Sequence, residues 1–328
     1  MNQRPRASRP GTLPYSRWWA LLAGALVGIL FRALVFVGRP GEPYAAMMAS
    51  FVYLAPIAVG AVTVYFAERI ERRSWSYYFF ASFLANVLFV IGTLLILIEG
   101  LICAILIVPL FAFLGGLGGL AMGLACRLTN WPKQTTFSIV LLPLVLGYFE
   151  THAPLPEQVR SVERSVLIDA PAHTVWDHIH FTPQVDSQDV RRAWIYRIGA
   201  PLPLSGITSE TGEGPVRTVR MTKDVRFEQA FLEWSPPHKA RWAYRFSPES
   251  FPPGALDEHV VIGGHYFDMQ EGSFTLTPRG DRTELTMSVR YRLSTQFNWY
   301  AAPIAGALLG NLEETVLDYY KRVSEARG

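Results

Sequence analysis

Cysteines and the common catalytic signatures are scarce in this 328-residue chain. Its two cysteines, Cys103 and Cys126, lie inside apolar segments, which excludes a disulfide framework and a thiolate metal cluster in the polar part of the chain. The sequence has no Gly-x-Ser-x-Gly elbow, no P-loop and no dinucleotide-binding glycine motif. It therefore carries no signature of a serine hydrolase, a nucleotide hydrolase or a nicotinamide-dependent enzyme.

Positive charge is also limited in the second half of the chain. Residues 1–150 carry 11 Lys and Arg against 5 Asp and Glu, whereas residues 151–328 carry 19 against 22. Because nucleic acids are bound by concentrated basic surfaces, this acidic balance argues against a nucleic-acid partner. Long apolar runs are concentrated before residue 150, so we predict two domains of different character.

Metal-ligand spacing is missing from the second half, which contains all seven histidines. They are His152, His173, His178, His180, His238, His259 and His265. A zinc site would need two histidines about one helical turn apart with a carboxylate nearby, whereas His178 and His180 point in different directions on a helix. The sequence predicts no metal site and no cofactor.

Apolar segments dominate the first half. Five of them approach the roughly 20 apolar residues that a helix needs to cross a bilayer. They cover residues 18–38, 44–67, 77–98, 101–126 and, the shortest, 134–149. We predict a basic tail at residues 1–17 and a transmembrane helical domain at residues 18–150. The first segment has no small-residue cleavage site and is expected to remain as an anchor.

Basic residues cluster at alternate ends of these segments. The clusters are Arg4, Arg6, Arg9 and Arg17 before the first segment, Arg69, Arg72 and Arg73 after the second, and Arg127 and Lys133 after the fourth. The positive-inside rule then places the N-terminus in the cytoplasm and, with five spans, the second half on the opposite side. We predict a bacterial inner-membrane protein whose soluble domain is periplasmic or extracytoplasmic.

Small and charged residues within the apolar segments have two interpretations each. Gly115, Gly119 and Gly123 recur every four residues, which favours close helix packing and leaves a lipid groove as the alternative. Arg32 is close enough to a helix end to reach the headgroups, although an intramembrane charge is also a functional candidate. Nothing in this half forms a transporter signature.

Period-two alternation begins after a linker at residues 151–158. Strands are predicted at residues 159–169, 192–198, 216–222, 226–234, 239–246, 265–277 and 283–293. A short helix follows Pro171, and an amphipathic helix covers residues 301–325. Two irregular loops, residues 199–215 and 247–264, are expected to rim a cavity. Because the last helix needs an apolar surface, we predict a curved antiparallel sheet around it over residues 159–328.

Three stretches of the second half carry a family resemblance. They are SVLIDAPAHTVWDHI at residues 165–179, FEQAFLEWSPP at residues 227–237, and FTLTP with GDRTELT at residues 274–286. In this order they resemble the START-like superfamily of polyketide cyclases, dehydrases and lipid-transfer proteins, also called SRPBCC. The resemblance covers about half of the chain and implies an α+β helix-grip fold. It also implies a deep apolar cavity between the sheet and the last helix.

The expected ligand-binding residues are bulky groups on candidate strands and small or apolar groups on the last helix. They are Trp194, Tyr196, Phe231, Trp242, Tyr244, Phe246, His265, Phe267, Met287, Tyr291, Ala305 and Leu309. Such a lining suits sterols, acyl chains or polycyclic molecules, although the same residues could fill an ordinary core. His265 and Tyr244 are the candidates for acid–base catalysis.

Three functions remain open at this point. The leading one is membrane-anchored binding or transfer of a lipid-like molecule, with membrane lipids and a hydrophobic small molecule as partners. The first alternative is a cyclase, dehydratase or hydrolase acting on an apolar or polyketide-like substrate. The second is a membrane-associated structural or regulatory module.

Overall fold

The computed structural model forms two compact units. It describes residues 18–39, 42–129, 133–150, 154–212, 214–257 and 259–326. The first unit comprises Met1–Ile98 and Ile107–His152, and the second comprises Glu99–Leu106 and Ala153–Gly328. The predicted basic tail and residues 151–153 of the predicted linker lie outside the described residues.

The first unit is helical and strongly apolar. Its elements are α1 (Trp19–Leu30), η1 (Phe31–Val35), η2 (Ser50–Leu54), α2 (Ala55–Ile70), α3 (Trp75–Leu95), α4 (Leu101–Leu128) from Ile107 onward, and α5 (Lys133–Phe149). Three of the described helical segments are long and apolar enough to cross a membrane, namely Ser50–Ile70, Trp75–Leu95 and Leu101–Leu128. The shorter apolar helices Trp19–Val35 and Val140–Phe149 bring the arrangement close to the predicted five.

Two predicted segments have different ends in the structure. The second begins at Ser50 rather than at Tyr44, because Tyr44 has a φ of 59°, which a right-handed helix does not admit. The third ends at Leu95 rather than at residue 98, since Leu97 also has a φ of 59°. Ser74 caps the start of that helix by accepting a hydrogen bond from the Tyr77 backbone N–H.

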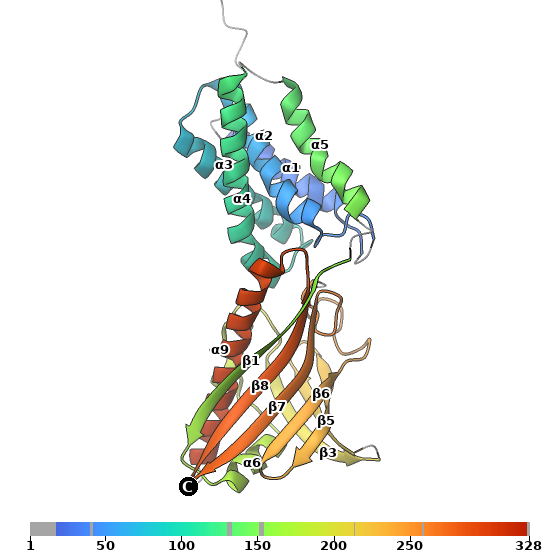
Figure 1. The fold of residues 1–328 in the computed structure, drawn as a ribbon, viewed down its shortest axis with the longest axis vertical. Coiled ribbons are helices and arrows are strands. Elements are labelled where there is room, and N and C mark those ends of the chain that lie inside the picture. Colours follow the sequence, from blue (N-terminus) through green and yellow to red (C-terminus); the bar gives the residue numbers. More distant parts are fainter. Residues whose placement is uncertain are drawn as a thin grey trace, which may run out of the picture. The chain divides into compact units, whose positions relative to one another are not determined.

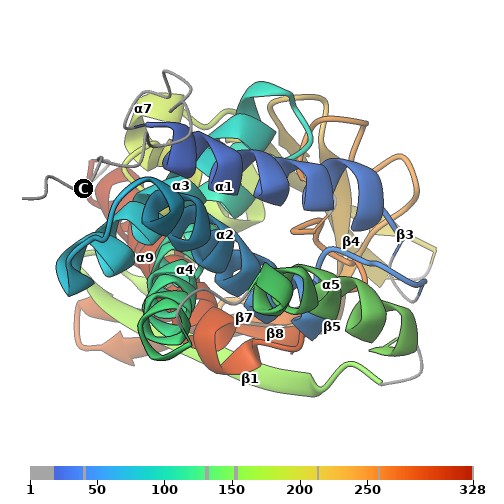
Figure 2. The same ribbon diagram turned by 90° about the horizontal axis from the view of Figure 1, so that it is seen from above.

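Close backbone approach explains the glycine stripe of α4. A Cβ on Gly119 would lie 2.3 Å from the Tyr78 carbonyl oxygen, and a Cβ on Gly115 would lie 1.8 Å from the Asn86 amide nitrogen. The Gly123 position is similarly filled by the Tyr78 ring. These contacts confirm the packing interpretation of the stripe, because any side chain there would separate α4 from α3. Helices α1, α2 and α3 pack side by side in both views of the fold (Figures 1 and 2).

Arg32 is buried at the end of the first helical segment. Its Nη1 donates a hydrogen bond to the Phe36 carbonyl oxygen at 2.7 Å, four residues further along the chain. The guanidinium thus satisfies a carbonyl group at the helix end, where the α-helical hydrogen-bond pattern stops. The contact agrees with the interpretation that Arg32 serves a helix end, and a functional role of Arg32 stays a prediction.

The second unit is built on one antiparallel sheet, and its strand order is β1-β8-β7-β6-β5-β4-β3-β2. The strands are β1 (Glu157–Ile168), β2 (Phe181–Thr182), β3 (Pro203–Thr211), β4 (Gly214–Met221), β5 (Arg226–Ser235), β6 (Lys239–Arg245), β7 (Phe267–Arg279) and β8 (Arg282–Ser294). The helices are α6 (Ala172–His180), α7 (Ser187–Val190), α8 (Trp194–Arg197) and α9 (Asn298–Glu325). Figure 1 shows the curved sheet with α9 along one face.

The sequence prediction was wrong at two places in this sheet. Residues 192–198 form no strand but contain the short helix α8, whose bulky residues had suggested a strand. Conversely, β3 lies inside the stretch 199–215 that was expected to be irregular. Gly206 and Thr208 supply its inward positions, so β3 has no apolar alternation that would predict a strand.

Helix α9 covers the inner face of the sheet. Leu317 and Tyr320 belong to a core with Trp242 and Phe274 from the strands, while Leu309 belongs to a second cluster with Tyr291. The helix begins three residues earlier than predicted. This arrangement of a curved antiparallel sheet around a long C-terminal helix confirms the predicted helix-grip fold.

Candidate functional site

A row of four residues crosses the inner face of the sheet beneath α9. Strand pairing places Thr208 on β3 opposite Arg217 on β4, Arg217 opposite Gln229 on β5, and Gln229 opposite Tyr244 on β6. Directly opposed residues of antiparallel strands project to the same face of a sheet. The register therefore aligns four polar side chains on adjacent strands, and we call them the polar row.

The polar row is buried but incompletely hydrogen-bonded. Arg217 is 9% exposed and Gln229 is 8% exposed. Among the described residues, no protein group within hydrogen-bonding geometry reaches Thr208 Oγ1, Arg217 Nε or Gln229 Oε1. Buried polar atoms without partners are rare in folded proteins, because each costs roughly 1–3 kcal/mol. The row is thus a feature of the fold that core packing does not explain.

Glu313 faces the sheet from α9. It is fully buried, and among the described residues no side chain hydrogen-bonds to either carboxyl oxygen, whereas the Val289 backbone approaches the group. Burial raises the pKa of Glu313 to about 8, although the Arg164 guanidinium and the Val289 backbone act in the opposite direction. At neutral pH this carboxyl group is therefore mainly protonated, and it can donate as well as accept a hydrogen bond.

Tyr244 lies at the centre of the polar groups. Burial raises the pKa of Tyr244 to about 12, and the Glu313 carboxyl also raises it, whereas the Trp242 and Gln229 side chains and the Arg217 guanidinium lower it. The Tyr244 hydroxyl is therefore neutral, and it interacts electrostatically with Glu313 on α9 and with Arg217 in the polar row. Its ring stacks on Phe246, with centroids 6.1 Å apart and an interplanar angle of 3°.

Aromatic side chains surround the row on neighbouring strands. Phe231 pairs with Trp242, and Trp242 pairs with Gly272. A Cβ on Gly272 would lie 2.5 Å from the indole ring, so the absence of a side chain there lets Trp242 lie over the sheet. Trp242 is 2% exposed, and its indole N–H approaches the Tyr244 hydroxyl.

Several other predicted ligand-binding residues also lie in the interior. Burial raises the pKa of Tyr196 on α8, and the nearby Tyr244 hydroxyl raises it further. The two hydroxyl groups therefore lie near one another. Met287 belongs to the core with Trp242, whereas Phe267, Tyr291, Ala305 and Leu309 form or border the second cluster under the first half of α9. Whether these residues contact a ligand stays a prediction.

The structure does not bring Trp194 or His265 into this interior. Trp194 is 51% exposed at the start of α8, where its backbone N–H donates to Asn311 Oδ1. His265 precedes β7 rather than belonging to it. It lies six residues before Glu271, which pairs with Ala243, the residue beside Tyr244. The two candidates for acid–base catalysis are therefore not adjacent.

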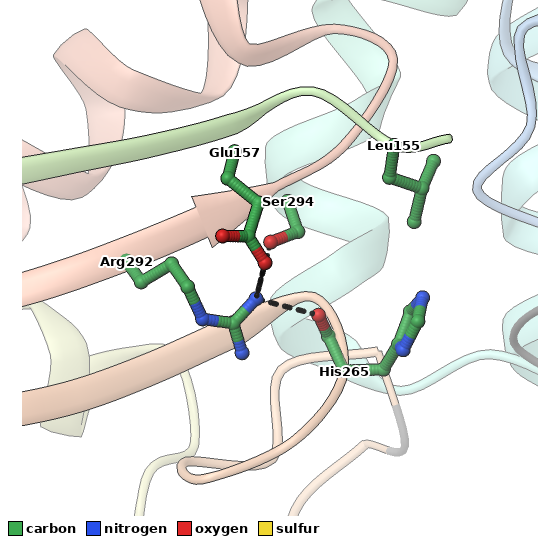
Figure 3. Close-up of a pocket in the computed structure, with 5 residues that line it drawn as sticks. All are labelled: Leu155, Glu157, His265, Arg292 and Ser294. Carbon is green, nitrogen blue, oxygen red and sulfur yellow. Dashed lines mark hydrogen bonds and ion pairs between the residues drawn. The ribbon is translucent and has the colours of Figure 1, made fainter. Parts of the chain in front are cut away.

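His265 instead borders a separate pocket of about 310 Å³ (Figure 3). The other lining residues are Leu155, Glu157, Arg292 and Ser294. Arg292 Nη1 donates to the His265 carbonyl oxygen at 3.1 Å and lies 3.5 Å from Glu157 Oε1, while the imidazole ring points away from the guanidinium. Because Arg292 already pairs with Glu157 and with the His265 carbonyl oxygen, we interpret this pocket as a structural contact rather than a ligand-binding site.

Glu313, Arg217, Gln229 and Thr208 were missing from the residues expected at the site. Glu313 had a detectable signal, because it lies four residues from both Leu309 and Leu317 and so falls in the apolar stripe of the last helix. Gln229 alternates with Phe227 and Phe231 and therefore shares their face. The polar row itself could not be found from the sequence, since it depends on the register of four strands.

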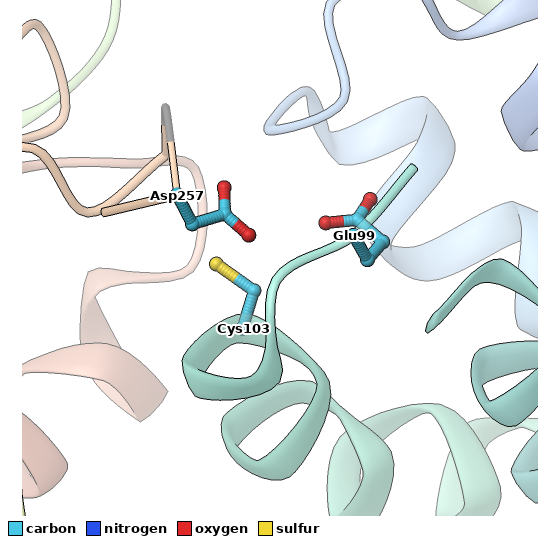
Figure 4. Close-up of side chains that lie close together, drawn as sticks. All are labelled: Glu99, Cys103 and Asp257. Atoms are coloured by element: carbon cyan, nitrogen blue, oxygen red, sulfur yellow. The ribbon is translucent and has the colours of Figure 1, made fainter. Parts of the chain in front are cut away.

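Metal-ligand atoms come together at one further place in the second unit (Figure 4). A carboxylate oxygen of Glu99, Cys103 Sγ and a carboxylate oxygen of Asp257 lie within 4.8 Å of one another. Asp257 Oδ2 also accepts a hydrogen bond from the Gly100 backbone N–H at 2.6 Å, and His259 Nε2 lies 3.9 Å from Glu99 Oε2. These side chains could hold a metal ion, and the histidine and cysteine spacings of the sequence did not indicate them.

The sheet, the gripped helix and the aromatic interior with its buried polar groups define a START-like protein of the helix-grip class. The comparison with protein families agrees, because the family described as polyketide cyclase / dehydrase and lipid transport matches residues 159–325. The chain belongs to this family. Its second half therefore has a fold suited to hydrophobic ligand binding or to cyclase-type chemistry.

Solved structures that are similar to this chain have low sequence identity to it. A START superfamily protein from Mycobacterium smegmatis is 14% identical, with 51% of this chain and 99% of that chain covered and a TM-score of 0.35. The Zhui aromatase/cyclase from Streptomyces sp. R1128 is 15% identical, with 52% and 96% covered and a TM-score of 0.33. Truncated norcoclaurine synthase from Thalictrum flavum is 13% identical, with 50% and 96% covered and a TM-score of 0.28. The comparison with curated proteins finds no match.

Proposed function

We propose that this protein binds a lipid-like hydrophobic ligand between the inner face of the sheet and α9, and that its apolar helices anchor it in a membrane. The observation that carries the proposal is the set of buried, unpartnered polar atoms within an aromatic interior. An apolar molecule with a polar group would bury its hydrocarbon against the rings and supply partners to those atoms. Membrane lipids are then both the surroundings of the anchor and a source of ligand.

The test compares two alanines on opposite faces of α9. Ala305 packs against the cluster that contains Tyr291 and Leu309, whereas Ala307 is exposed. The full chain is purified in detergent, transferred to lipid nanodiscs, and extracted for mass spectrometry of the bound small molecules. Ala305→Phe should reduce the recovered ligand several-fold by filling the interior, whereas Ala307→Phe should retain it. Melting midpoints close to that of the wild type establish that both variants are folded.

The proposal fails if the wild type and both variants carry the same molecules in the same amounts. That result would mean that everything recovered surrounds the helices as bulk lipid. The competing interpretation, a structural or regulatory module, predicts this outcome.

Catalysis is a second candidate, favoured by the buried Glu313 carboxyl beside Tyr244. With a pKa of about 8, this group could protonate a leaving hydroxyl of a bound polyketide-like ligand. In such a dehydration a C–O bond and an adjacent C–H bond break, a C=C bond forms, and water leaves. Glu313→Gln should then accumulate a ligand that is heavier by one water than the molecule recovered from the wild type. Identical masses from the two proteins would exclude this reaction.

We further propose that the N-terminus is cytoplasmic and that the sheet domain lies on the extracytoplasmic side of a bacterial inner membrane. The basic clusters at alternate ends of the apolar segments support this orientation. C-terminal fusions to alkaline phosphatase and to green fluorescent protein test it in bacterial cells. An active phosphatase with a dark fluorescent protein is expected, and the reverse pattern would place the domain in the cytoplasm.

A further inference from the structure

The buried cation of the polar row has no anionic partner among the described residues. Arg217 Nη2 donates a hydrogen bond to the Tyr320 hydroxyl at 3.1 Å, and Nε has no partner. The ion pairs of the described chain do not include Arg217. The polar group of α9 that contacts Arg217 is thus the neutral hydroxyl of Tyr320, although Arg217 is nine-tenths buried.

Such an arrangement is unfavourable without a counter-charge. A guanidinium stays ionised in proteins, and removing it from water costs several kcal/mol unless an anion is bound in good geometry. Glu313 does not supply that charge at neutral pH, because burial raises its pKa to about 8. The interior therefore carries an uncompensated positive charge where a ligand would bind.

The groups around Arg217 also favour an acceptor-rich ligand. The Tyr244 hydroxyl lies close enough to Arg217 to be influenced by its charge. Gly206 leaves room for the guanidinium, since a Cβ there would lie 2.5 Å from Nη2. A planar anion with two oxygens matches the fork of a guanidinium.

We propose that the ligand is an amphiphile with a carboxylate, which pairs with Arg217 while its hydrocarbon lies among the aromatic residues under α9. This inference rests on the proposed function and names the chemical class of its ligand. The carboxylate would offset the buried charge and accept a hydrogen bond from Nε of Arg217.

The test uses the full chain in nanodiscs and three photoactivatable probes with the same hydrocarbon chain. They are a long-chain fatty acid, its methyl ester and the corresponding alkyl phosphate. Cross-linked peptides from residues 203–245 are quantified by mass spectrometry, so that binding in the interior is separated from dissolution in the bilayer. The acid should label these peptides with at least about tenfold higher apparent affinity than the ester.

Arg217→Gln should bring labelling by the acid to within about twofold of labelling by the ester, and a melting midpoint of the full chain measured beside the wild type establishes that the variant is folded. The matched control is Arg220→Gln, because Arg220 lies on the same strand but is exposed, and the preference should remain within about twofold of the wild type.

Each outcome bears on one proposal. Equal labelling by acid and ester in the wild type would overturn the carboxylate proposal and leave the ligand-binding function standing. A stronger preference for the alkyl phosphate than for the acid would also overturn it, because the anion would then be a phosphate. Labelling of these peptides by none of the three probes would contradict the ligand-binding function itself.

Discussion

Arg217 on β4 and Tyr320 on α9 are joined by a hydrogen bond of 3.1 Å from the guanidinium Nη2 to the phenol oxygen. This bond links the polar row to the second half of the helix that covers it. Tyr320 is itself buried against Phe274 of β7, with ring centroids 5.6 Å apart. Tyr320 therefore accepts a hydrogen bond from the buried Arg217 guanidinium and also packs α9 against the sheet.

Tyr320→Phe should destabilise the second unit because it leaves Nη2 of Arg217 without its acceptor. Removing one partner of a buried charged hydrogen bond costs about 1–3 kcal/mol. In a domain of this size each kcal/mol lowers the melting midpoint by about 2–4 °C. Scanning calorimetry of the full chain in detergent measures the shift. Tyr319→Phe is the control, since no hydrogen bond of its hydroxyl occurs among the described residues, and an equal shift in both variants would contradict the prediction.

Glu313 should make the folded state less stable as the pH rises. An unfolded glutamate ionises near pH 4.3, whereas the folded pKa is about 8, so between these values the folded chain holds a proton that the unfolded chain has lost. The contribution of Glu313 is complete below pH 4 and declines by about 1.4 kcal/mol per pH unit until pH 8. The charged groups facing it are Arg164 and Glu163 on β1 and Glu314 on α9, with Tyr244 on β6.

Glu313→Gln should therefore be more stable than the wild type at pH 8, and the two proteins should converge near pH 4. Melting midpoints measured across this range give the difference directly. Glu314→Gln serves as the matched control because Glu314 is exposed and paired with Arg164 at 3.1 Å. A constant difference between the Glu313 variant and the wild type at all pH values would show that the folded pKa is not raised.

Gly272→Ala should disturb the aromatic interior. The new Cβ would lie 2.5 Å from the Trp242 indole, so the ring or the strand must shift. Overpacking of this kind costs about 1–3 kcal/mol. A lowered melting midpoint and reduced labelling by the ligand probes are the expected results. Gly212→Ala is the control, because a Cβ there meets no atom within 4 Å, and its midpoint should not change.

Glu68 should hold the end of α2 to the start of α3 in the first unit. Its Oε1 accepts hydrogen bonds from the Tyr78 hydroxyl at 2.6 Å and from the Arg73 backbone N–H at 2.8 Å. Glu68→Leu removes both and should cost about 2–4 kcal/mol, because buried donors lose their acceptor. Local opening near this site would then be more frequent.

The rate at which a maleimide labels Cys126 measures that opening, because Cys126 is buried in the same cluster as Tyr78. In a Cys103→Ser background the Glu68 variant should react roughly 30 to 1000 times faster, following the factor of ten for each 1.4 kcal/mol. Glu71→Leu is the control, since Glu71 is exposed. Equal labelling rates for the two variants would show that Glu68 does not hold this end of the helices.

The two-part division and the helix-grip fold could be predicted because they depend on local patterns. The alternation of Leu285, Met287 and Val289 and the helical spacing of Leu309, Leu317 and Tyr320 are properties of short segments. The prediction failed at α8, where Trp194 and Tyr196 suggested a strand, and at β3, where small polar residues concealed one. In both places the surrounding structure outweighed a weak local signal.

The sequence by itself predicted the gripped helix and the curved sheet around it, because both follow from local apolar periodicity. Only the tertiary structure decided that Thr208, Arg217, Gln229 and Tyr244 lie side by side, because strand register is set by contacts between segments distant in the chain. It also decided the protonation state of Glu313, since the pKa of a carboxyl group depends on the atoms that surround it after folding.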